Sequence, residues 1–263
     1  MKITANGVNF NLQVSGEGHS LVLVHGFPLN SNMWAPQLGG LASSVRVSAP
    51  DLRGHGGSEV VPGPYSMDLL ADDCASLLET MGVDEPVTLC GLSMGGYVAF
   101  SFFRRHPKRL RALILAATRA GADSPEGKTG REQAAATAQT QGTGTIMNNM
   151  LAKMLAPSTN SENPALSGRV RQIMEGNSLE SYVGDLLGMR DRQDSTPTLS
   201  QIDIPTLILH GAEDQLIPSS EAENMHRAIG GSQLRILPSS GHLLNLEQPE
   251  QFNLAVGEFL GAV

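Results

Sequence analysis

The run Thr88-Leu89-Cys90-Gly91-Leu92-Ser93-Met94-Gly95-Gly96 decides the fold of this chain. An apolar segment at residues 87–90 predicts a buried strand, and the stretch at residues 97–106 predicts a helix. Ser93 lies in the turn between them, with one glycine two residues before it and another two residues after it. This context gives a G-x-S-x-G match its meaning, because so sharp a turn strains the serine backbone and presents the hydroxyl at the edge of the sheet. Ser93 is therefore a candidate nucleophile, and an idle serine in a glycine-rich turn is the alternative.

A serine hydroxyl needs a base to remove its proton, and the base needs an acid partner. His242 follows the apolar segment at residues 233–237, and Asp214 follows the one at residues 206–209. The chain order Ser93, Asp214, His242 is the order expected for a triad on an open α/β sheet. Glu213 and Asp123 are the alternative acids. The other histidines lack the spacing of a metal site, so neither a metal nor an organic cofactor is predicted.

An acyl-transfer site also needs N–H donors for the oxyanion. The backbone N–H of Met94, directly after the nucleophile, is one candidate. The second is the N–H of Phe27 in His25-Gly26-Phe27-Pro28, the loop that follows the apolar segment at residues 21–24. The Phe27 ring is also a candidate wall of the pocket, which is compatible with a main-chain role.

These motifs, together with Asp51-Leu52-Arg53-Gly54-His55-Gly56-Gly57-Ser58, resemble the α/β-hydrolase superfamily over nearly the whole chain. Within it, the chain resembles the small serine carboxylesterases and the 3-oxoadipate enol-lactone hydrolases. The resemblance implies that residues 51–58 form a structural loop beside the oxyanion hole, and Asp51 and Arg53 are placed to pair locally.

Alternating segments indicate an α/β fold with a mostly parallel, doubly covered sheet of about eight strands. Strands are expected at residues 8–14, 21–24, 45–49, 87–90, 113–116, 206–209 and 234–237. Helices are expected at residues 32–41, 67–81, 97–106, 219–229 and 249–260.

Residues 119–200 break this alternation and predict a helical cap inserted between two parts of the hydrolase core, residues 1–118 and 201–263. The apolar side chains on its helix faces are expected either to form the interior of the cap or to line an adaptable acyl pocket. The candidate pocket residues are Phe27, Met147, Met150, Met154 and Leu187.

Composition excludes several classes of partner. With 40% hydrophobic residues and a net charge of −8, the chain is globular and lacks the basic excess that nucleic acids and anionic membranes select. Neither a signal peptide nor a membrane-spanning run is evident, and the two cysteines are expected to be buried and reduced. A cytoplasmic protein is predicted, whereas no motif encodes the oligomeric state.

The predicted function is hydrolysis of small or medium acyl esters through an acyl-enzyme. One alternative is a lactonase acting on a substrate like 3-oxoadipate enol-lactone, which requires a cation in the pocket because that molecule carries a carboxylate. The candidate cations are Arg119, Arg131, Lys153, Arg169, Arg190 and Arg192. A further alternative is a small-molecule receptor that keeps the scaffold and turns over slowly or not at all.

Overall fold

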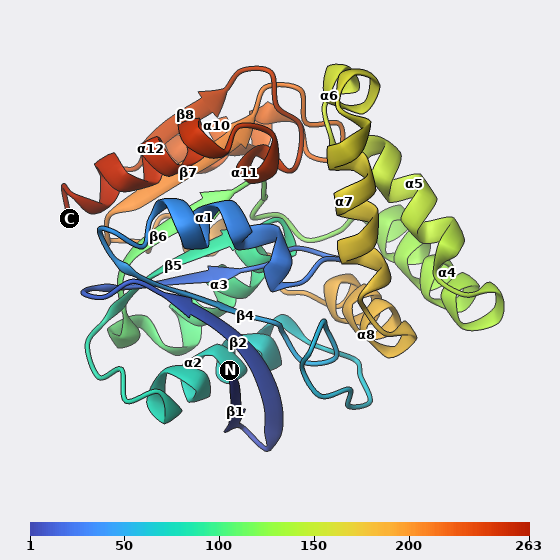
Figure 1. Cartoon of the computed structure of the whole chain (residues 1–263), viewed down its shortest axis with the longest axis horizontal. Coiled ribbons are helices and arrows are strands. Elements are labelled where there is room, and N and C mark those ends of the chain that lie inside the picture. The colour runs from blue at the N-terminus through green and yellow to red at the C-terminus, as the bar shows by residue number, and fades with distance from the viewer.

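The seven expected strands and one more pair into a single sheet (Figure 1) in the computed structural model, which describes residues 1–263. The strands are β1 (Lys2–Ala5), β2 (Val8–Ser15), β3 (Ser20–Val24), β4 (Arg46–Pro50), β5 (Val87–Leu92), β6 (Leu110–Ala116), β7 (Thr206–Gly211) and β8 (Gln233–Leu237). Their order across the sheet is β1-β2-β4-β3-β5-β6-β7-β8. The expected α/β architecture with about eight strands is confirmed.

The additional strand, β1, forms an antiparallel hairpin with β2. Asn6 and Gly7 make its turn, and both have positive φ angles, 44° and 72°. Asn-Gly is the strongest short sequence signal for such a two-residue turn. The dipeptide could therefore have revealed β1 before the structure did.

All strand pairs from β4 to β8 are parallel, so their carboxyl ends lie along one edge. The register pairs Val24 with Gly91, Leu92 with Ala116, and Ala116 with Leu209. The loops that follow β3, β5, β6 and β7 consequently begin next to one another in that order along this edge. Ligands of open α/β sheets bind at this edge.

Alternate strand residues point to opposite faces of the sheet, and helices bury both faces. Val22 and Val24 pack into a cluster with α2 (Met67–Thr80) and α3 (Met94–Arg105). Leu21 and Leu23 pack into a second cluster with α1 (Ala35–Gly40) and α12 (Pro249–Leu260). Helices of the hydrolase core are η1 (Ser31–Trp34), α1 (Ala35–Gly40), α2 (Met67–Thr80), α3 (Met94–Arg105), η2 (Pro107–Arg109), α10 (Ser219–Ala228), α11 (Leu244–Glu247) and α12 (Pro249–Leu260).

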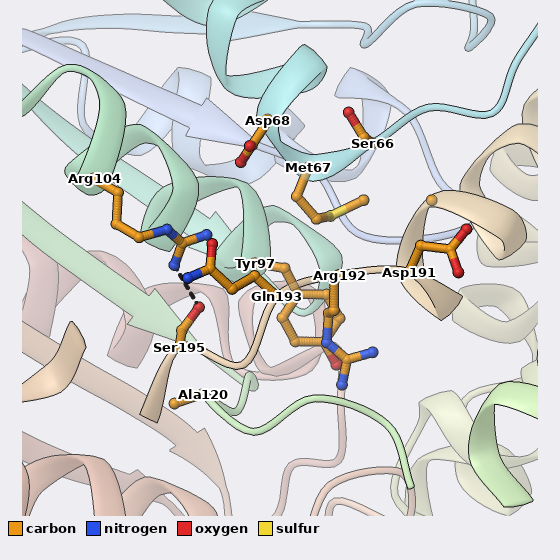
Figure 2. Close-up of a pocket in the computed structure, with 11 residues that line it drawn as sticks. Ser66, Met67, Asp68, Tyr97, Arg104, Ala120, Asp191, Arg192, Gln193 and Ser195 are labelled. Carbon is orange, nitrogen blue, oxygen red and sulfur yellow. Dashed lines mark hydrogen bonds between the residues drawn. The ribbon is translucent and has the colours of Figure 1, made fainter. Parts of the chain in front are cut away.

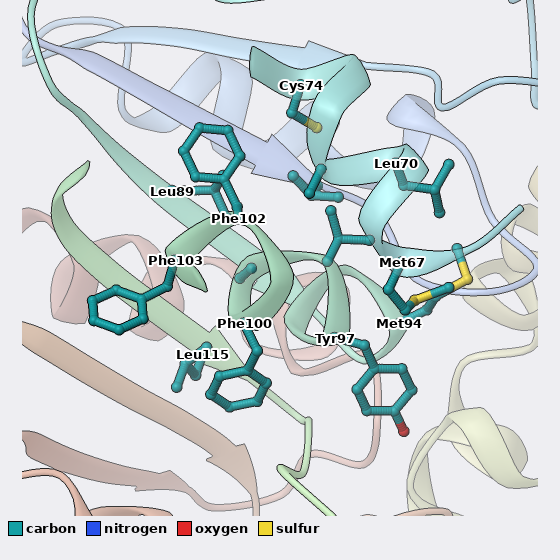
Figure 3. Packing of buried hydrophobic residues seen from close by; sticks show 14 of the residues in the cluster. Met67, Leu70, Cys74, Leu89, Met94, Tyr97, Phe100, Phe102, Phe103 and Leu115 are labelled. Atoms are coloured by element: carbon teal, nitrogen blue, oxygen red, sulfur yellow. The ribbon is translucent and has the colours of Figure 1, made fainter. Parts of the chain in front are cut away.

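Four aromatic side chains of α3 belong to the first cluster (Figure 3): Tyr97, Phe100, Phe102 and Phe103. Phe100 and Phe102 are fully buried, and α3 packs against α2, where Met67, Leu70 and Cys74 are buried. Both cysteines, Cys74 and Cys90, are free and buried, as expected. This packing fixes the helix that starts directly after Ser93.

The interval between β6 and β7 contains six helices, most of which lie to one side of the sheet (Figure 1). They are α4 (Pro125–Gln141), α5 (Gly144–Met154), α6 (Pro157–Glu162), α7 (Pro164–Glu175), α8 (Leu179–Arg190) and α9 (Thr196–Leu199). We call residues 119–200 the helical region, and its division from the core as a cap remains a prediction. None of the helices is long and apolar enough to cross a membrane.

Candidate active site

Ser93 lies in a strained turn between β5 and α3, with φ 57° and ψ −113°. Glycine is required on both sides of it. A Cβ at Gly91 would lie 2.1 Å from the carbonyl oxygen of Gly95, and a Cβ at Gly95 would lie 2.2 Å from that of Val24. Only glycine permits these backbone approaches, which explains the spacing in the sequence.

Neighbouring groups hold the strained serine in place. The Ser93 N–H donates to the carbonyl oxygen of Ala116 at 2.9 Å. The Ser93 carbonyl oxygen accepts bonds from the Thr118 hydroxyl at 2.8 Å and from the Gly96 N–H at 2.9 Å. A residue with positive φ persists only where its surroundings determine its conformation, and these bonds do so here.

His242 lies in the loop after β8, and its Nδ1 is 2.8 Å from Oδ2 of Asp214. The second carboxylate oxygen, Oδ1, accepts the N–H groups of Leu216 at 2.8 Å and Ile217 at 3.0 Å. The carboxylate is thereby fixed by the turn after β7, with one oxygen left for the imidazole. Both side chains are at least 98% buried.

The pKa of Asp214 is held below its usual value. Burial alone would raise this pKa, but the charge of His242 and hydrogen bonds from His242, Ile217 and Leu216 outweigh it. The side chain is therefore a carboxylate at neutral pH and can hold the imidazole with Nδ1 protonated and Nε2 free to accept a proton.

The two alternative acids lie in different environments. Glu213 is exposed, and Asp123 pairs with arginines instead of a histidine. Of the three carboxylates considered from the sequence, only Asp214 is within hydrogen-bond distance of His242.

The loop after β3 passes directly over Ser93. A Cβ at Gly26 would lie 3.1 Å from Cβ of Ser93 and 3.0 Å from the carbonyl oxygen of Leu92. The next residue, Phe27, donates its backbone N–H to no acceptor within the protein. Met94 is the first residue of α3, where helix N–H groups lack intrahelical partners. Both predicted oxyanion donors therefore come from backbone segments beside the serine.

Ser93 and His242 line one cavity of about 200 Å³. The other lining residues are Phe27, Tyr97, Arg119, Arg131, Met150, Met189, Leu216 and Ile217. Of the expected pocket residues, Phe27 and Met150 line it. The apolar lining agrees with a site for a small acyl group, but Arg119 and Arg131 add two cations to it.

The other expected pocket residues lie elsewhere, which corrects that part of the prediction. Met154 is fully buried in the second core cluster, Met147 is not among the residues that line the cavity, and Leu187 lines a separate cavity with Pro62 and Gly63. Helical periodicity predicts which side chains share an apolar face, but it does not show what that face covers.

Sequence reasoning also misplaced the partner of Arg53. Its Nε donates to Asp73 at 2.6 Å, and not to Asp51. Asp51 instead accepts backbone N–H groups from Ser31 at 2.7 Å and Gly57 at 2.8 Å. Asp51 thus folds its own loop, while Arg53 anchors that loop to α2.

Glu247 connects the loop that carries His242 to the helical region. Its Oε2 accepts the Gly241 N–H at 2.8 Å, and its Oε1 accepts the Ala156 N–H at 2.7 Å and the Thr159 hydroxyl at 2.8 Å. One side chain therefore bonds the residue before His242 and the segment between α5 and α6.

A second cavity, of about 120 Å³, shares only Tyr97 with the first (Figure 2). Arg104 lines it and donates to the Ser195 hydroxyl at 2.7 Å. Arg192 also lines it, and its guanidinium carbon lies 4.2 Å from the centre of the Tyr97 ring. Tyr97 therefore separates Arg192 from the cavity that holds Ser93.

Comparison with known proteins identifies the family of this chain. A model of the alpha/beta hydrolase fold family matches residues 19–249. A 3-oxoadipate enol-lactonase from Acinetobacter baylyi is 28% identical over 97% of this chain and 94% of its own length.

Solved structures of an esterase and an enol-lactonase are also similar to this chain. An esterase from Thermogutta terrifontis, determined with malate bound, is 40% identical, with a TM-score of 0.96 over 100% of this chain and 98% of its own. An enol-lactonase from Burkholderia xenovorans is 27% identical, with a TM-score of 0.92 over 99% and 100%.

Proposed function

Because the chain belongs to the α/β-hydrolase fold family, we propose that it is a serine hydrolase of carboxylic esters with small or medium acyl groups. Ser93 is the proposed nucleophile, His242 the general base and Asp214 the residue that orients it. The observation that carries the proposal is the 2.8 Å bond between Asp214 and a histidine that lines the same cavity as the strained serine.

The proposed reaction begins with attack of Ser93 Oγ on the ester carbonyl while Nε2 of His242 accepts the hydroxyl proton. Asp214 keeps the imidazole in the required tautomer and stabilises the imidazolium that forms. The Phe27 and Met94 N–H groups stabilise the oxyanion, and loss of one such donor typically lowers kcat by about 10²–10³. His242 then protonates the leaving alkoxide, which departs as the alcohol. Water attacks the acyl-enzyme in the same way, with His242 accepting its proton, and releases the acid and the free Ser93 hydroxyl.

The test is kcat/KM for p-nitrophenyl esters of increasing acyl length, with Ser93→Ala as the matched variant. We expect an optimum at short to medium acyl groups and a loss of about 10⁴ or more in the variant, as in other triads that lose their nucleophile. Near-normal turnover in Ser93→Ala would refute the proposed nucleophile. Uniformly low turnover in the wild type would favour the receptor alternative.

A second candidate is lactone hydrolysis by the same residues. It is favoured by Arg119 and Arg131, which provide the cation that an enol-lactone bearing a carboxylate requires. A kcat/KM for 3-oxoadipate enol-lactone well above that for every simple ester would select this candidate. The reverse order would select the esterase.

A further inference from the structure

The loop after β3 forms a tight turn around Phe27, whose N–H is a proposed oxyanion donor. The N–H of Leu29 donates to the carbonyl oxygen of Gly26 at 2.9 Å, so Phe27 and Pro28 are the two central residues of the turn. The Gly26 end lies against the nucleophile, because a Cβ there would be 3.1 Å from Cβ of Ser93. The direction of the Phe27 N–H therefore depends on what holds the other end of the turn.

The carbonyl oxygen of Pro28, at that other end, is held from the helical region. Proline has no N–H, so this oxygen is the only backbone hydrogen-bonding atom of the residue. Its one donor within the protein is Nδ2 of Asn177, at 2.8 Å. Oδ1 of the same amide accepts the N–H of Gly56 at 2.9 Å, in the loop at residues 51–58. Both partners are backbone groups of fixed polarity, so only one orientation of the Asn177 amide satisfies them.

Asn177 is itself fixed at the end of α7. Its N–H donates to the carbonyl oxygen of Met174 at 3.3 Å, and its Nδ2 also lies 3.2 Å from the carbonyl oxygen of Ile173. Asn30, two residues after Pro28, donates to the same Ile173 oxygen at 3.1 Å and to Oδ1 of Asn177 at 3.3 Å. The Asn177 amide thus joins the end of α7 to two loops of the hydrolase core.

The Phe27 side chain contacts the same part of the helical region. Its ring meets the ring of Tyr182, in α8, edge to face, with the ring centroids 5.5 Å apart. Tyr182 is fully buried, and its hydroxyl donates to the carbonyl oxygen of Met174 at 3.1 Å. The turn is therefore held through the Phe27 ring and through the Pro28 carbonyl, in both cases by a residue that is bonded to the end of α7.

We propose that Asn177 is a positioning residue for the Phe27 N–H, so that the helical region fixes one of the two oxyanion donors. This inference rests on the proposed serine hydrolase mechanism and adds a residue to it. Asn177 lines no part of the cavity with Ser93, so its effect is indirect. Without its amide, the Pro28 carbonyl loses its partner and the turn no longer holds the Phe27 N–H in one direction. A displacement of about 1 Å in such a group lowers the rate by up to about 10²-fold.

The experiment replaces the asparagines at the two ends of α7. Asn177→Ala removes the bond to Pro28. Asn163→Ala is the matched control, because Asn163 caps the start of the same helix by accepting the Leu166 N–H at 3.1 Å and bonds neither core loop. We expect Asn177→Ala to lower kcat for p-nitrophenyl butyrate by about 10- to 100-fold with KM unchanged, the pattern of an interaction made only in the transition state. Asn163→Ala should leave kcat unchanged, although both variants should unfold at a lower urea concentration.

Asn177→Asp separates the two bonds of the amide. The substituted side chain keeps the size of asparagine and an acceptor for the Gly56 N–H, but it loses the donor to Pro28. We expect a loss of kcat equal to or larger than that of Asn177→Ala. A loss confined to Asn177→Ala would overturn the assignment to the Pro28 bond.

Binding of a trifluoromethyl ketone reports on the oxyanion hole directly. When Ser93 Oγ adds to the carbonyl carbon of butyl trifluoromethyl ketone, His242 takes the hydroxyl proton and the carbonyl oxygen becomes an oxyanion, as in the transition state. The Ki of this ketone should rise in Asn177→Ala by the factor lost from kcat. The Ki of butyl methyl ketone, which forms no stable adduct, should not change.

A wild-type kcat in Asn177→Ala, or an equal loss of kcat in Asn163→Ala, would overturn the inference. A raised KM with unchanged kcat would also overturn it, because Asn177 would then shape binding and not the oxyanion hole. In each case the serine hydrolase proposal still stands if Ser93→Ala, measured alongside, has lost turnover. Persistent turnover in Ser93→Ala would instead refute the serine hydrolase proposal itself.

Discussion

Helices α3 and α4 show how differently two parts of this molecule constrain their sequences. Ten of the twelve residues of α3 are buried, whereas only Ala135 and Ala138 are buried among the seventeen of α4. The start of α3 is pressed against backbone atoms of β3, whereas a Cβ added at Gly130 in α4 would meet no atom within 4 Å.

The difference indicates what each helix must do. The start of α3 positions Ser93, the proposed nucleophile. That position depends on contacts between main-chain atoms, which no side-chain rearrangement can relieve. The exposed face of α4 makes few such contacts, so most of its residues are replaceable. The backbone is therefore most tightly constrained around Ser93. The helical region contributes a few side chains to the wall of the cavity.

The first test of this contrast is Gly95→Ala. The added Cβ would lie 2.2 Å from the carbonyl oxygen and 2.9 Å from the carbonyl carbon of Val24, which are backbone atoms. We expect a loss of about 3 kcal/mol in the free energy of unfolding, at the upper end of overpacking effects, and a large loss of ester turnover. Urea denaturation and kcat/KM measure the two effects. A variant as stable and active as the wild type would refute the claim that this approach is critical.

The second test concerns Asp123, which lies between β6 of the hydrolase core and α4 of the helical region. Its pKa falls from 3.8 to about 2 in the folded protein, so its ionised form stabilises the fold above about pH 4. This stabilisation, about 2 kcal/mol, should disappear as the pH falls from about 4 to 2.

The measurement is the free energy of unfolding between pH 2 and pH 6 for the wild type and Asp123→Asn. The difference between the two proteins should be largest at pH 6 and shrink below pH 4. Because Asp123 is 3% exposed and bonded only to arginines, a difference independent of pH would contradict the assigned ion pairs.

The smallest expected effect is that of Gly168→Ala in α7, where the added Cβ meets no atom within 4 Å. Replacing glycine with alanine inside an exposed helix should stabilise the protein by about 0.5–1 kcal/mol. Differential scanning calorimetry should show a raised Tm with unchanged kcat/KM. A glycine-to-alanine substitution would thus lower the free energy of unfolding in α3 and raise it in α7. A lower Tm for Gly168→Ala would contradict this difference between the two helices.

The parts of the site that depend on backbone geometry could be predicted from the sequence. Gly91, Gly95 and Gly26 mark close approaches of main-chain atoms, and these leave a pattern in neighbouring residues. His242 and Asp214 follow apolar strands, so strand order places them at one edge of the sheet.

The lining of the cavity could not be predicted in the same way. Met189, Leu216 and the two arginines reach it from separate segments, and their approach depends on how the helical region packs on the core. Met154 shares an apolar helix face with Met147 and Met150 but is buried in the second core cluster, and Leu187 lines a separate cavity. The spacing of residues in the sequence predicts which side chains share a face of one helix or strand. The lining of a cavity depends on how several helices and loops pack together.

Glu247 holds together the helical region and the loop of His242, the proposed general base. Because one carboxylate bonds both Gly241 and Ala156, a displacement of the segment between α5 and α6 pulls directly on the loop of His242. The N–H of Leu243 also donates to the carbonyl oxygen of Met154 at 3.1 Å, which adds a second tie. At this end of the molecule, the helical region and the loop of His242, the proposed acceptor of the Ser93 proton, are therefore joined through one shared carboxylate and one direct hydrogen bond.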